Sequence, residues 1–401
     1  MNQQDKEVRV SVIIPAYNVE KYIEQCLESF LPEHDPSIEV ICVDDGSTDR
    51  TLEILRSYES RDNRITVISQ ENAGAGAARN KGMQYARGEY LAFFDADDFF
   101  EPGVLACAYD KATEENSDIV VFACDDYLEE TGGYRPIHYS IHTEQLPEHR
   151  PFAGAEIRDN FFEAFVGWPW DKIFRRHFVE AHQLSFQEQR TTNDALFVFS
   201  ALLIADRIST MEEVFAHHRR VGSGKSLSVS REKSWSCFYS ALLAIRDRLN
   251  EWKLYDRRER DFINYSLNFS IWHLNTLKGD AYHRLYRKLK DEWFKELGVL
   301  EKPEEFFYFR DKYESLQAVL SMDSEEYLHF LADQNQAIVD AQRLELERLY
   351  RQQGQTNQEL QRTRRDLEQM KKKYTEIQKM KSYRIGRAIT LPYRAIRDRL
   401  K

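Results

Sequence analysis

The sequence has no long hydrophobic run. The longest apolar stretch near the N-terminus covers residues 12–14 and ends at Pro15, and no segment of about 18 apolar residues occurs further along. We therefore expect neither a membrane-spanning helix nor a secretory signal. Hydrophobic residues nevertheless make up 42% of the chain and aromatic residues 13%. This content is enough to build a core and excludes wholesale disorder.

Cysteine is also scarce, with five among 401 residues. Their number is odd and no two of them form a C-x-x-C pair, so buried or free thiols in a reducing cytoplasm are the simplest interpretation. The five cysteines are Cys26, Cys42, Cys107, Cys124 and Cys237.

Two common nucleotide-binding signatures are missing. No G-x-x-x-x-G-K-[ST] segment occurs, which disfavours a P-loop protein. Gly74 and Gly76 resemble part of a dinucleotide fingerprint, but Arg79 occupies the third glycine position and the segment follows the third predicted strand. A Rossmann dehydrogenase is therefore disfavoured. The net charge of −11 argues against a nucleic-acid partner.

The first 125 residues do contain a regular alternation of short apolar runs and segments with helical spacing. This alternation predicts an α/β fold, in which a mostly parallel, Rossmann-like sheet is covered by helices on both faces. Ligands of such sheets bind beyond the carboxyl ends of the strands. The predicted strands cover residues 8–14, 38–43, 64–68, 90–94 and 118–122. The predicted helices cover residues 22–30, 51–58 and 73–86.

Polar side chains gather after four of these strands, at residues 15–18, 44–49, 72–80 and 95–98. Asp95, Asp97 and Asp98 directly follow a strand that should be buried. Carboxylates this close repel one another unless a cation lies among them, and hard divalent ions prefer carboxylate oxygen. The cluster therefore predicts a metal site, although a loose cap on the following helix is the alternative.

These segments, in this order and spacing, resemble family 2 glycosyltransferases of the inverting, bacterial polysaccharide type, which have the GT-A fold. The resemblance covers about residues 8–228 and rests on Val-Ile-Ile-Pro-Ala-Tyr-Asn at 12–18, Val-Asp-Asp-Gly-Ser-Thr-Asp at 43–49, Asn-Ala-Gly-Ala-Gly-Ala-Ala-Arg-Asn at 72–80 and Phe-Asp-Ala-Asp-Asp at 94–98.

The resemblance implies a role for each matching residue at a nucleotide-sugar site. Pro15 and Tyr17 would flank the base, and Asp45 would accept a hydrogen bond from it, commonly from uracil. Arg79 would shape the base and ribose pocket, and Asp95 would face the ribose and the metal. Asp97 would bind Mg²⁺ or Mn²⁺ at the diphosphate, with Asp98 as the competing ligand.

A second set of segments extends the resemblance towards the acceptor side. Trp-Pro-Trp-Asp-Lys-Ile-Phe-Arg at 168–175 resembles the W-x-K stretch of the family, and Asn193-Asp194 stands where the family usually has Glu-Asp. Asp194 would be the catalytic base, with Glu188 in reserve. A helix N-cap is the structural alternative for Asp194.

Residues 214–228 resemble the segment before a Ser-rich loop that closes over the pyrophosphate. The resemblance implies that Arg219, Arg220 or Lys225 contacts the pyrophosphate there. Histidines replace the usual tyrosines at His217 and His218. Either histidine could reach the metal, but a packed strand histidine is the simpler interpretation.

The function implied is transfer of a sugar, with inversion, from a nucleotide-diphosphate donor to a hydroxyl of a glycan or lipid-linked acceptor. A UDP-sugar is favoured, the process is cell-surface polysaccharide synthesis, and no covalent nucleophile is needed. The alternative is a catalytically inactive GT-A-like oligomeric membrane scaffold. A nucleotide-sugar pyrophosphorylase is disfavoured, because residues 15–18 are not a Gly-rich loop bearing Arg or Lys.

The chain beyond this catalytic domain, assigned to residues 1–230, changes character twice. Residues 231–323 predict a helical domain. Residues 324–380 predict a coiled-coil helix that links copies in a homo-oligomer, because seam positions alternate three and four apart. A long solvated helix is the alternative. The seam positions are Leu346, Leu349, Gln353, Thr356, Leu360, Thr363, Leu367, Met370, Tyr374 and Ile377.

The basic end of the chain contrasts with an acidic body. Residues 341–401 hold 17 Lys and Arg against 7 Asp and Glu, a net charge of +10, which leaves −21 on the first 340 residues. The tail at 381–401 mixes arginines with bulky apolar residues, as interfacial membrane segments do. We therefore expect a peripheral protein on an anionic membrane, at the cytoplasmic face of the cell membrane. A basic tail that binds nothing in particular is the alternative.

Overall fold

The structure is a computed structural model that describes residues 8–31, 37–221 and 231–379. Two compact units make up the chain, residues 1–324 and residues 325–401. In the described part of the first unit, nine strands form one sheet in the order β3-β2-β1-β4-β8-β6-β9-β5, with β7 paired to β6. The strands are β1 (Val10–Ala16), β2 (Ile38–Asp44), β3 (Ile65–Ser69), β4 (Tyr90–Phe93), β5 (Phe99–Phe100), β6 (Ile119–Leu128), β7 (Gly133–Pro136), β8 (Lys172–Arg175) and β9 (Ile208–Arg220).

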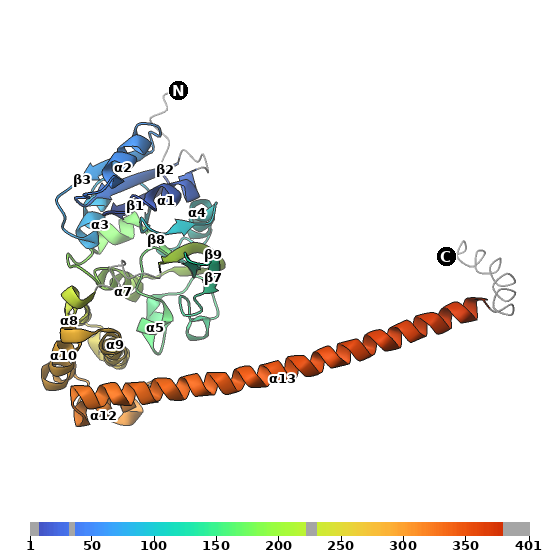
Figure 1. The fold of residues 1–401 in the computed structure, drawn as a ribbon. Coiled ribbons are helices and arrows are strands. Elements are labelled where there is room, and N and C mark those ends of the chain that lie inside the picture. Colours follow the sequence, from blue (N-terminus) through green and yellow to red (C-terminus); the bar gives the residue numbers. More distant parts are fainter. Residues whose placement is uncertain (1–7, 32–36, 222–230, 380–401) are drawn as a thin grey trace. The chain divides into compact units, whose positions relative to one another are not determined.

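Helices connect and cover these strands and then continue beyond them (Figure 1). Those among the strands are α1 (Ile23–Phe30), α2 (Thr51–Glu59), α3 (Ala75–Met83), α4 (Val104–Glu114), α5 (Phe161–Ala164), α6 (Arg176–Ala181) and α7 (Ala195–Ile204). Those after the sheet are α8 (Cys237–Glu251), α9 (Tyr255–Thr276), α10 (Gly279–Lys288), α11 (Phe294–Glu296), α12 (Arg310–Ser321) and α13 (Ser324–Lys379).

The first four strands along the chain are parallel to one another, as the sequence predicts. Strand β1 pairs in parallel with β2 and β4, and β2 pairs in parallel with β3. The register places Ala16 opposite Asp44 and Asp44 opposite Ser69, so these strands end at one edge. The polar segments that follow the strands therefore start side by side.

Alternating side chains of the strands build two layers of core. One face packs on α1, α2 and α4 through residues such as Val12, Val40 and Phe30, all fully or almost fully buried. The opposite face meets α3 and α7. A Cβ on Gly82 of α3 would lie 2.5 Å from Ile13 Cγ2, and the Phe93 and Phe197 rings are 5.3 Å apart. Helices on both faces thus cover the sheet, as expected.

The second half of the sheet is mixed, which the sequence pattern missed. Strand β8 runs antiparallel to β4 and β6, while β9 runs parallel to β6 and antiparallel to β5. β5 has two residues and half of β9 is polar, so neither has the apolar run by which the other strands are recognised. These strands carry the loop after Asp95 and the segment at Arg219.

The predicted helical region folds as helices α8 to α12 and belongs to the same compact unit as the sheet. Arg258 of α9 is buried beside Asp261 and donates to the carbonyl oxygens of Ile157 and Gly154. The Tyr265 ring stacks on Phe162 at 5.2 Å. The helices therefore pack on the segment at residues 154–162 of the sheet domain through buried polar and aromatic contacts.

The second unit is described as a single helix, α13, of 56 residues. None of the helices among the described residues combines the length and apolar character needed to cross a bilayer. The basic tail at 381–401, for which we expect membrane binding, lies outside the described residues.

Candidate functional site

Two loops are tied together at the ends of β1 and β2. The Asn18 carboxamide oxygen accepts hydrogen bonds from the Thr48 backbone N–H at 2.8 Å, and the Asn18 backbone N–H donates to Ser47 Oγ at 3.1 Å. Pro15 is half-buried, and the Tyr17 side chain is 48% exposed. The exposed Tyr17 ring is therefore accessible beside a loop that these hydrogen bonds hold in place.

Asp45 is buried directly beyond β2 and fixes the loop before α3. Its Oδ1 accepts from Gln70 Nε2 and the Ala73 N–H, and its Oδ2 accepts from the Gly74 N–H, each at 2.8 Å. Because each carboxylate oxygen has two acceptor positions, Oδ2 keeps one for a further donor. Gly74 has φ +92°, a conformation that suits glycine. The Asp45 carboxylate is thus held by two backbone N–H groups and one side-chain amide, all of them uncharged donors.

Arg79 joins segments that are far apart in the sequence. The side chain is 5% exposed; its Nη2 pairs with Asp95 Oδ1 at 2.5 Å, and its Nη1 donates to Asn193 Oδ1 at 2.9 Å. The guanidinium carbon lies 5.2 Å from the Phe186 ring centroid. Arg79 therefore brings the end of β4 to the start of α7.

Asp97 and Asp98 differ sharply in their surroundings. Asp98 is buried, and its Oδ1 accepts from the Arg219 N–H at 2.8 Å while its Oδ2 has no partner among the described residues. Burial, together with Asp97 and Asp95, raises the pKa of Asp98 well above its usual range. Asp97 is open to solvent, although crowding by protein and the Asp95 charge raise its pKa as well. Asp97 is therefore the carboxylate that faces outward.

Asp194 stands at the N-cap of α7 and is half-buried. Its side chain makes no capping hydrogen bond to the helix. Burial raises the pKa of Asp194, and the nearby Arg79 charge opposes this effect. A carboxylate with a raised pKa and no capping partner suits proton abstraction.

Gly76 makes the close approach of these segments possible. A Cβ at this position would lie 2.1 Å from the Gln187 carbonyl oxygen and 3.1 Å from Asn193 Cβ. Only a residue without a side chain leaves room for the Asn193 segment against α3. We call Asp45, Arg79, Asp95, Asp97 and Asp194 the strand-end site.

Arg219 reaches the strand-end site but all of its nitrogens are already engaged. Nε donates to the Asp97 carbonyl oxygen at 2.8 Å, Nη2 donates to Gln25 Oε1 at 2.7 Å, and Nη1 pairs with Glu129. These contacts hold the loop of Asp97 in place rather than leaving the guanidinium free. Lys225, also expected at the pyrophosphate, lies outside the described residues.

The histidines of β9 are held by carboxylates in the sheet. His217 is buried between Asp125 at 2.6 Å and Glu101 at 3.0 Å, which agrees with a packed strand histidine. His218 pairs with Asp126 at 3.1 Å, and Arg220 Nε donates to the same carboxylate at 2.7 Å. The reserve base, Glu188, is exposed, with Asn80 Nδ2 at 3.4 Å from its Oε1.

The sequence pattern assigned no structural role to two buried residues, Asn193 at this site and Lys172 of β8. Asn193 receives the Arg79 hydrogen bond, and Lys172 is fully buried, with its Nζ donating to Asp171, the Val166 carbonyl and the Trp168 carbonyl. Asn193 occupies the position of the missing Glu, which was the available signal. Lys172 lies in the W-x-K stretch, where it fixes the chain that carries Trp168.

The described residues contain no group of three or more His, Cys, Asp or Glu side chains placed to hold a metal on their own. Asp95 and Asp97 flank one buried residue, Ala96, and both carboxylates are at least partly accessible. Hard divalent ions commonly bind one or two carboxylates together with phosphates of a substrate. The residues present therefore fit an ion that a diphosphate helps to bind.

Comparison with known proteins matches this arrangement. Residues 11–182 match the family model described as glycosyl transferase family 2. The chain is 34% identical over 288 residues to EpsH of Bacillus subtilis, which its name classes as a glycosyltransferase, covering 70% of this chain and 81% of EpsH. It is 28% identical over 300 residues to a poly(ribitol-phosphate) beta-glucosyltransferase of Bacillus spizizenii, covering 73% of this chain and 44% of that protein.

Among solved structures, residues 1–349 of TarS from S. aureus in complex with UDP have a similar fold. The TM-score is 0.59 with 24% sequence identity, and the match covers 80% of this chain and 89% of the TarS chain. Fold and relatives together define a glycosyltransferase with the GT-A fold. More particularly, the chain belongs to glycosyltransferase family 2.

Proposed function

We propose that this family 2 enzyme transfers a sugar, with inversion and with the help of Mg²⁺ or Mn²⁺, from a nucleotide-diphosphate donor to a hydroxyl group. The observation that carries the proposal is the Arg79 ion pair, which gathers Asp95 and the Asn193-Asp194 segment into one site. The acceptor is a glycan or a lipid-linked glycan of a surface polysaccharide. The beta-glucosyltransferase relative, whose name specifies poly(ribitol-phosphate), supports a polymeric acceptor.

A donor diphosphate has to be held while it leaves with negative charge. Asp95 and Asp97 would hold the divalent ion, which supplies electrostatic stabilisation of the leaving diphosphate when bound. Burial and, after it, the Asp95 charge raise the pKa of Asp97, and a divalent ion between the two carboxylates would offset both effects. Arg219 acts by holding the Asp97 carbonyl, and Lys225 remains a proposed contact to the pyrophosphate.

The acceptor hydroxyl has to lose a proton during direct displacement. Asp194 is the proposed base, and its raised pKa brings it closer to neutral pH, where a carboxylate base is more effective. Glu188 is the reserve base, but its exposure lets water compete there. Asn193 and Arg79 position Asp194 from the buried side.

A UDP-sugar is the proposed donor. TarS, which shares the fold, has been solved with UDP and with UDP-GlcNAc. In this chain, Pro15 lies near the end of β1 and Tyr17 lies directly beyond it. Asp45 Oδ2 has a free acceptor position of the kind that a uracil N–H requires. The base would lie between these groups.

The experiment incubates the full chain with UDP-, GDP- and dTDP-sugars and measures release of the nucleoside diphosphate, with Mn²⁺ or with EDTA. We expect release from a UDP-sugar in Mn²⁺ and its loss in EDTA. Undiminished release in EDTA would contradict the metal role. Absence of release from every donor, even with an added glycan acceptor, would favour the inactive scaffold.

Two further proposals concern membrane binding and oligomerisation. We propose that residues 381–401 bring the enzyme to the cytoplasmic face of an anionic membrane and that α13 links it into a homo-oligomer. Co-sedimentation of the full chain and of a chain ending at residue 380 with anionic liposomes tests the first. Equal binding of the two chains would contradict it.

A further inference from the structure

Helix α13 exposes a stripe of large apolar side chains along one face. Their side chains are between 48% and 63% exposed, although apolar groups of this size are normally covered. They recur at the three- and four-residue spacing of a coiled-coil seam. The exposed seam residues are Leu346, Leu349, Leu360, Leu367, Met370 and Tyr374.

Acidic and basic side chains lie on opposite sides of part of this stripe. The positions just before Leu360 and Leu367 hold Glu359 and Asp366, and the positions just after Thr363 and Met370 hold Arg364 and Lys371. Over these two heptads one flank is thus acidic and the other basic. The flank positions of the other heptads are Glu345, Tyr350, Gln352, Asn357, Lys373 and Gln378.

The four flanking charges of the two heptads from Leu360 to Met370 have no ion-pair partner within the described part of the chain. They are Glu359, Arg364, Asp366 and Lys371, and all four are exposed. The ion pairs of α13 lie nearer its start, for example between Glu347 and Arg351 at 3.9 Å. The four charges are therefore available to another molecule.

We propose that α13 pairs with the same helix of a second copy of this chain, in parallel and in register. In that arrangement Glu359 and Asp366 each face the basic residue five positions further along the other helix. Glu359 then meets Arg364 of the second copy, and Asp366 meets Lys371. Each pair occurs twice by symmetry, and none of the flanking pairs joins like charges.

The polar residues of the seam favour the same register. Gln353, Thr356 and Thr363 interrupt the apolar stripe. In register, each meets its own counterpart and can exchange hydrogen bonds with it. A shift by one heptad instead places Gln353 against Leu346 and Leu360. An antiparallel pair is disfavoured by charge, because it brings acidic flank to acidic flank and basic flank to basic flank.

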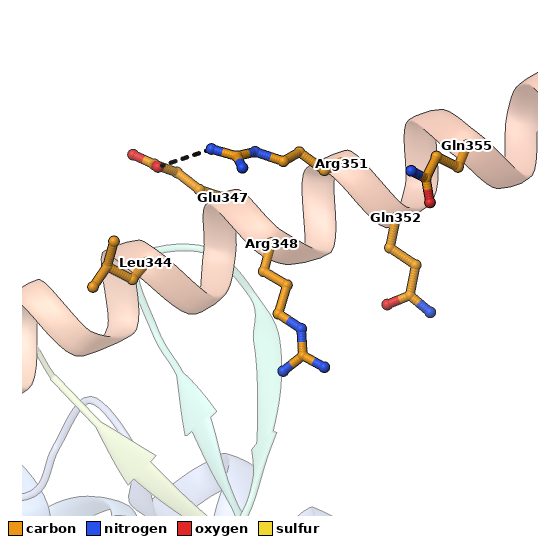
Figure 2. Close-up of a pocket in the computed structure, with 6 residues that line it drawn as sticks. All are labelled: Leu344, Glu347, Arg348, Arg351, Gln352 and Gln355. Carbon is orange, nitrogen blue, oxygen red and sulfur yellow. Dashed lines mark ion pairs between the residues drawn. The ribbon is translucent and has the colours of Figure 1, made fainter.

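The other side of the helix has a different character. Figure 2 shows a hollow along α13 whose lining is mainly polar and charged, including the ion pair of Glu347 and Arg351. All but one of its residues lie outside the seam and its flanks. This face suits solvent, so the seam is the side that a partner helix covers. The lining residues are Leu344, Glu347, Arg348, Arg351, Gln352 and Gln355.

The first experiment measures the mass of the full chain in solution by light scattering at micromolar concentration. We expect a mass of two chains, and a mass of one chain would overturn the proposal. Changing Glu359→Arg with Asp366→Lys should convert the protein to single chains, because basic residues then face basic residues. The matched control is Glu368→Arg with Glu376→Lys, which adds the same charge off the flanks and should remain a pair.

Mixing tests whether the flanks face each other. The Glu359→Arg, Asp366→Lys chain is combined with an Arg364→Glu, Lys371→Asp chain. Each variant alone should be a single chain, and the mixture should form a mixed pair. Failure of the mixture to associate while the control variant remains paired would overturn the flank assignment.

Orientation is tested by disulfide formation. Leu346→Cys and Met370→Cys, made separately, should each cross-link to an identical chain under mild oxidation, because a parallel pair places equal positions together. The unmodified chain is the control for native thiols such as the exposed Cys107. Cross-linking only when the two variants are mixed would overturn the parallel arrangement. None of these measurements depends on catalytic activity.

Discussion

The strand-end site and helix α13 differ in how far apart along the chain their interacting residues lie. In the site, Arg79 binds Asn193 across 114 positions, and the Arg219 N–H binds Asp98 across 121 positions. In α13, ion pairs join residues three or four apart. A substitution in the site should therefore destabilise several segments of the sheet domain, whereas a substitution in α13 should affect only its neighbourhood in the helix.

The largest expected effect separates the two adjacent carboxylates of the site. Asp97→Asn should reduce sugar transfer by about two orders of magnitude or more, because the outward carboxylate contributes charge to the diphosphate site. Asp98→Asn should reduce sugar transfer by less than about tenfold. Asp98 is buried and accepts a hydrogen bond from the Arg219 N–H, and the side-chain oxygen of an Asn can accept the same hydrogen bond. Initial transfer rates at saturating donor measure both. Equal losses of transfer rate in the two variants would contradict the different roles given to Asp97 and Asp98.

Replacing Arg79 tests the long-range link itself. Arg79→Ala leaves Asp95 and Asn193 without their shared partner, and we expect a loss of about 3 kcal/mol in the free energy of unfolding. Urea unfolding measures the loss. The matched control is Arg50→Ala, whose ion pair with Glu53 is exposed and should contribute little to the free energy of unfolding. Similar losses in the two variants would show that Arg79 does not hold the segments together.

The carboxylate of Asp126 in β6 allows a test of how the stability of the fold depends on pH. Although burial opposes the shift, His218, Arg135 and Arg220 together lower the pKa of Asp126 below its usual range. A lowered folded-state pKa means stability that is present above the unfolded-state pKa and lost as the pH falls through the folded-state value. Asp126→Asn should therefore cost about 2 kcal/mol at neutral pH.

That cost should shrink as the medium becomes acidic. Unfolding of wild type and Asp126→Asn at several pH values measures the difference. A cost that stays constant from neutral to strongly acidic pH would show that charge on Asp126 is not its cause.

The smallest effect on chemistry is expected in the helix. Leu360→Lys with Leu367→Lys should break the seam yet leave release of nucleoside diphosphate within about twofold of wild type, because each substitution stays on an exposed helix face. The measurement pairs solution mass with donor turnover. A large loss of turnover together with dissociation would show that the two regions are coupled.

The same difference in range explains what could be predicted from the sequence. The strands of the first half, the order of the site segments and the long helix follow from local periodicity and were predicted. The antiparallel strands and the buried role of Asn193 were not, because β5 is too short and Asn193 acts only through Arg79. The engagement of Arg219 was missed for the same reason, since its partners come from three distant segments, at Gln25, at Asp97 and Asp98, and at Glu129.

The most direct test of the account is transfer by Asp194→Asn, compared with Asp206→Asn, which changes an exposed aspartate just beyond the other end of α7. Circular dichroism first checks that both variants are folded to the same extent. Turnover is then measured with a UDP-sugar donor and a glycan acceptor. We predict that Asp194→Asn loses about 10²–10⁴-fold in turnover, while Asp206→Asn stays close to wild type. Near wild-type turnover by Asp194→Asn would contradict the assignment of the base.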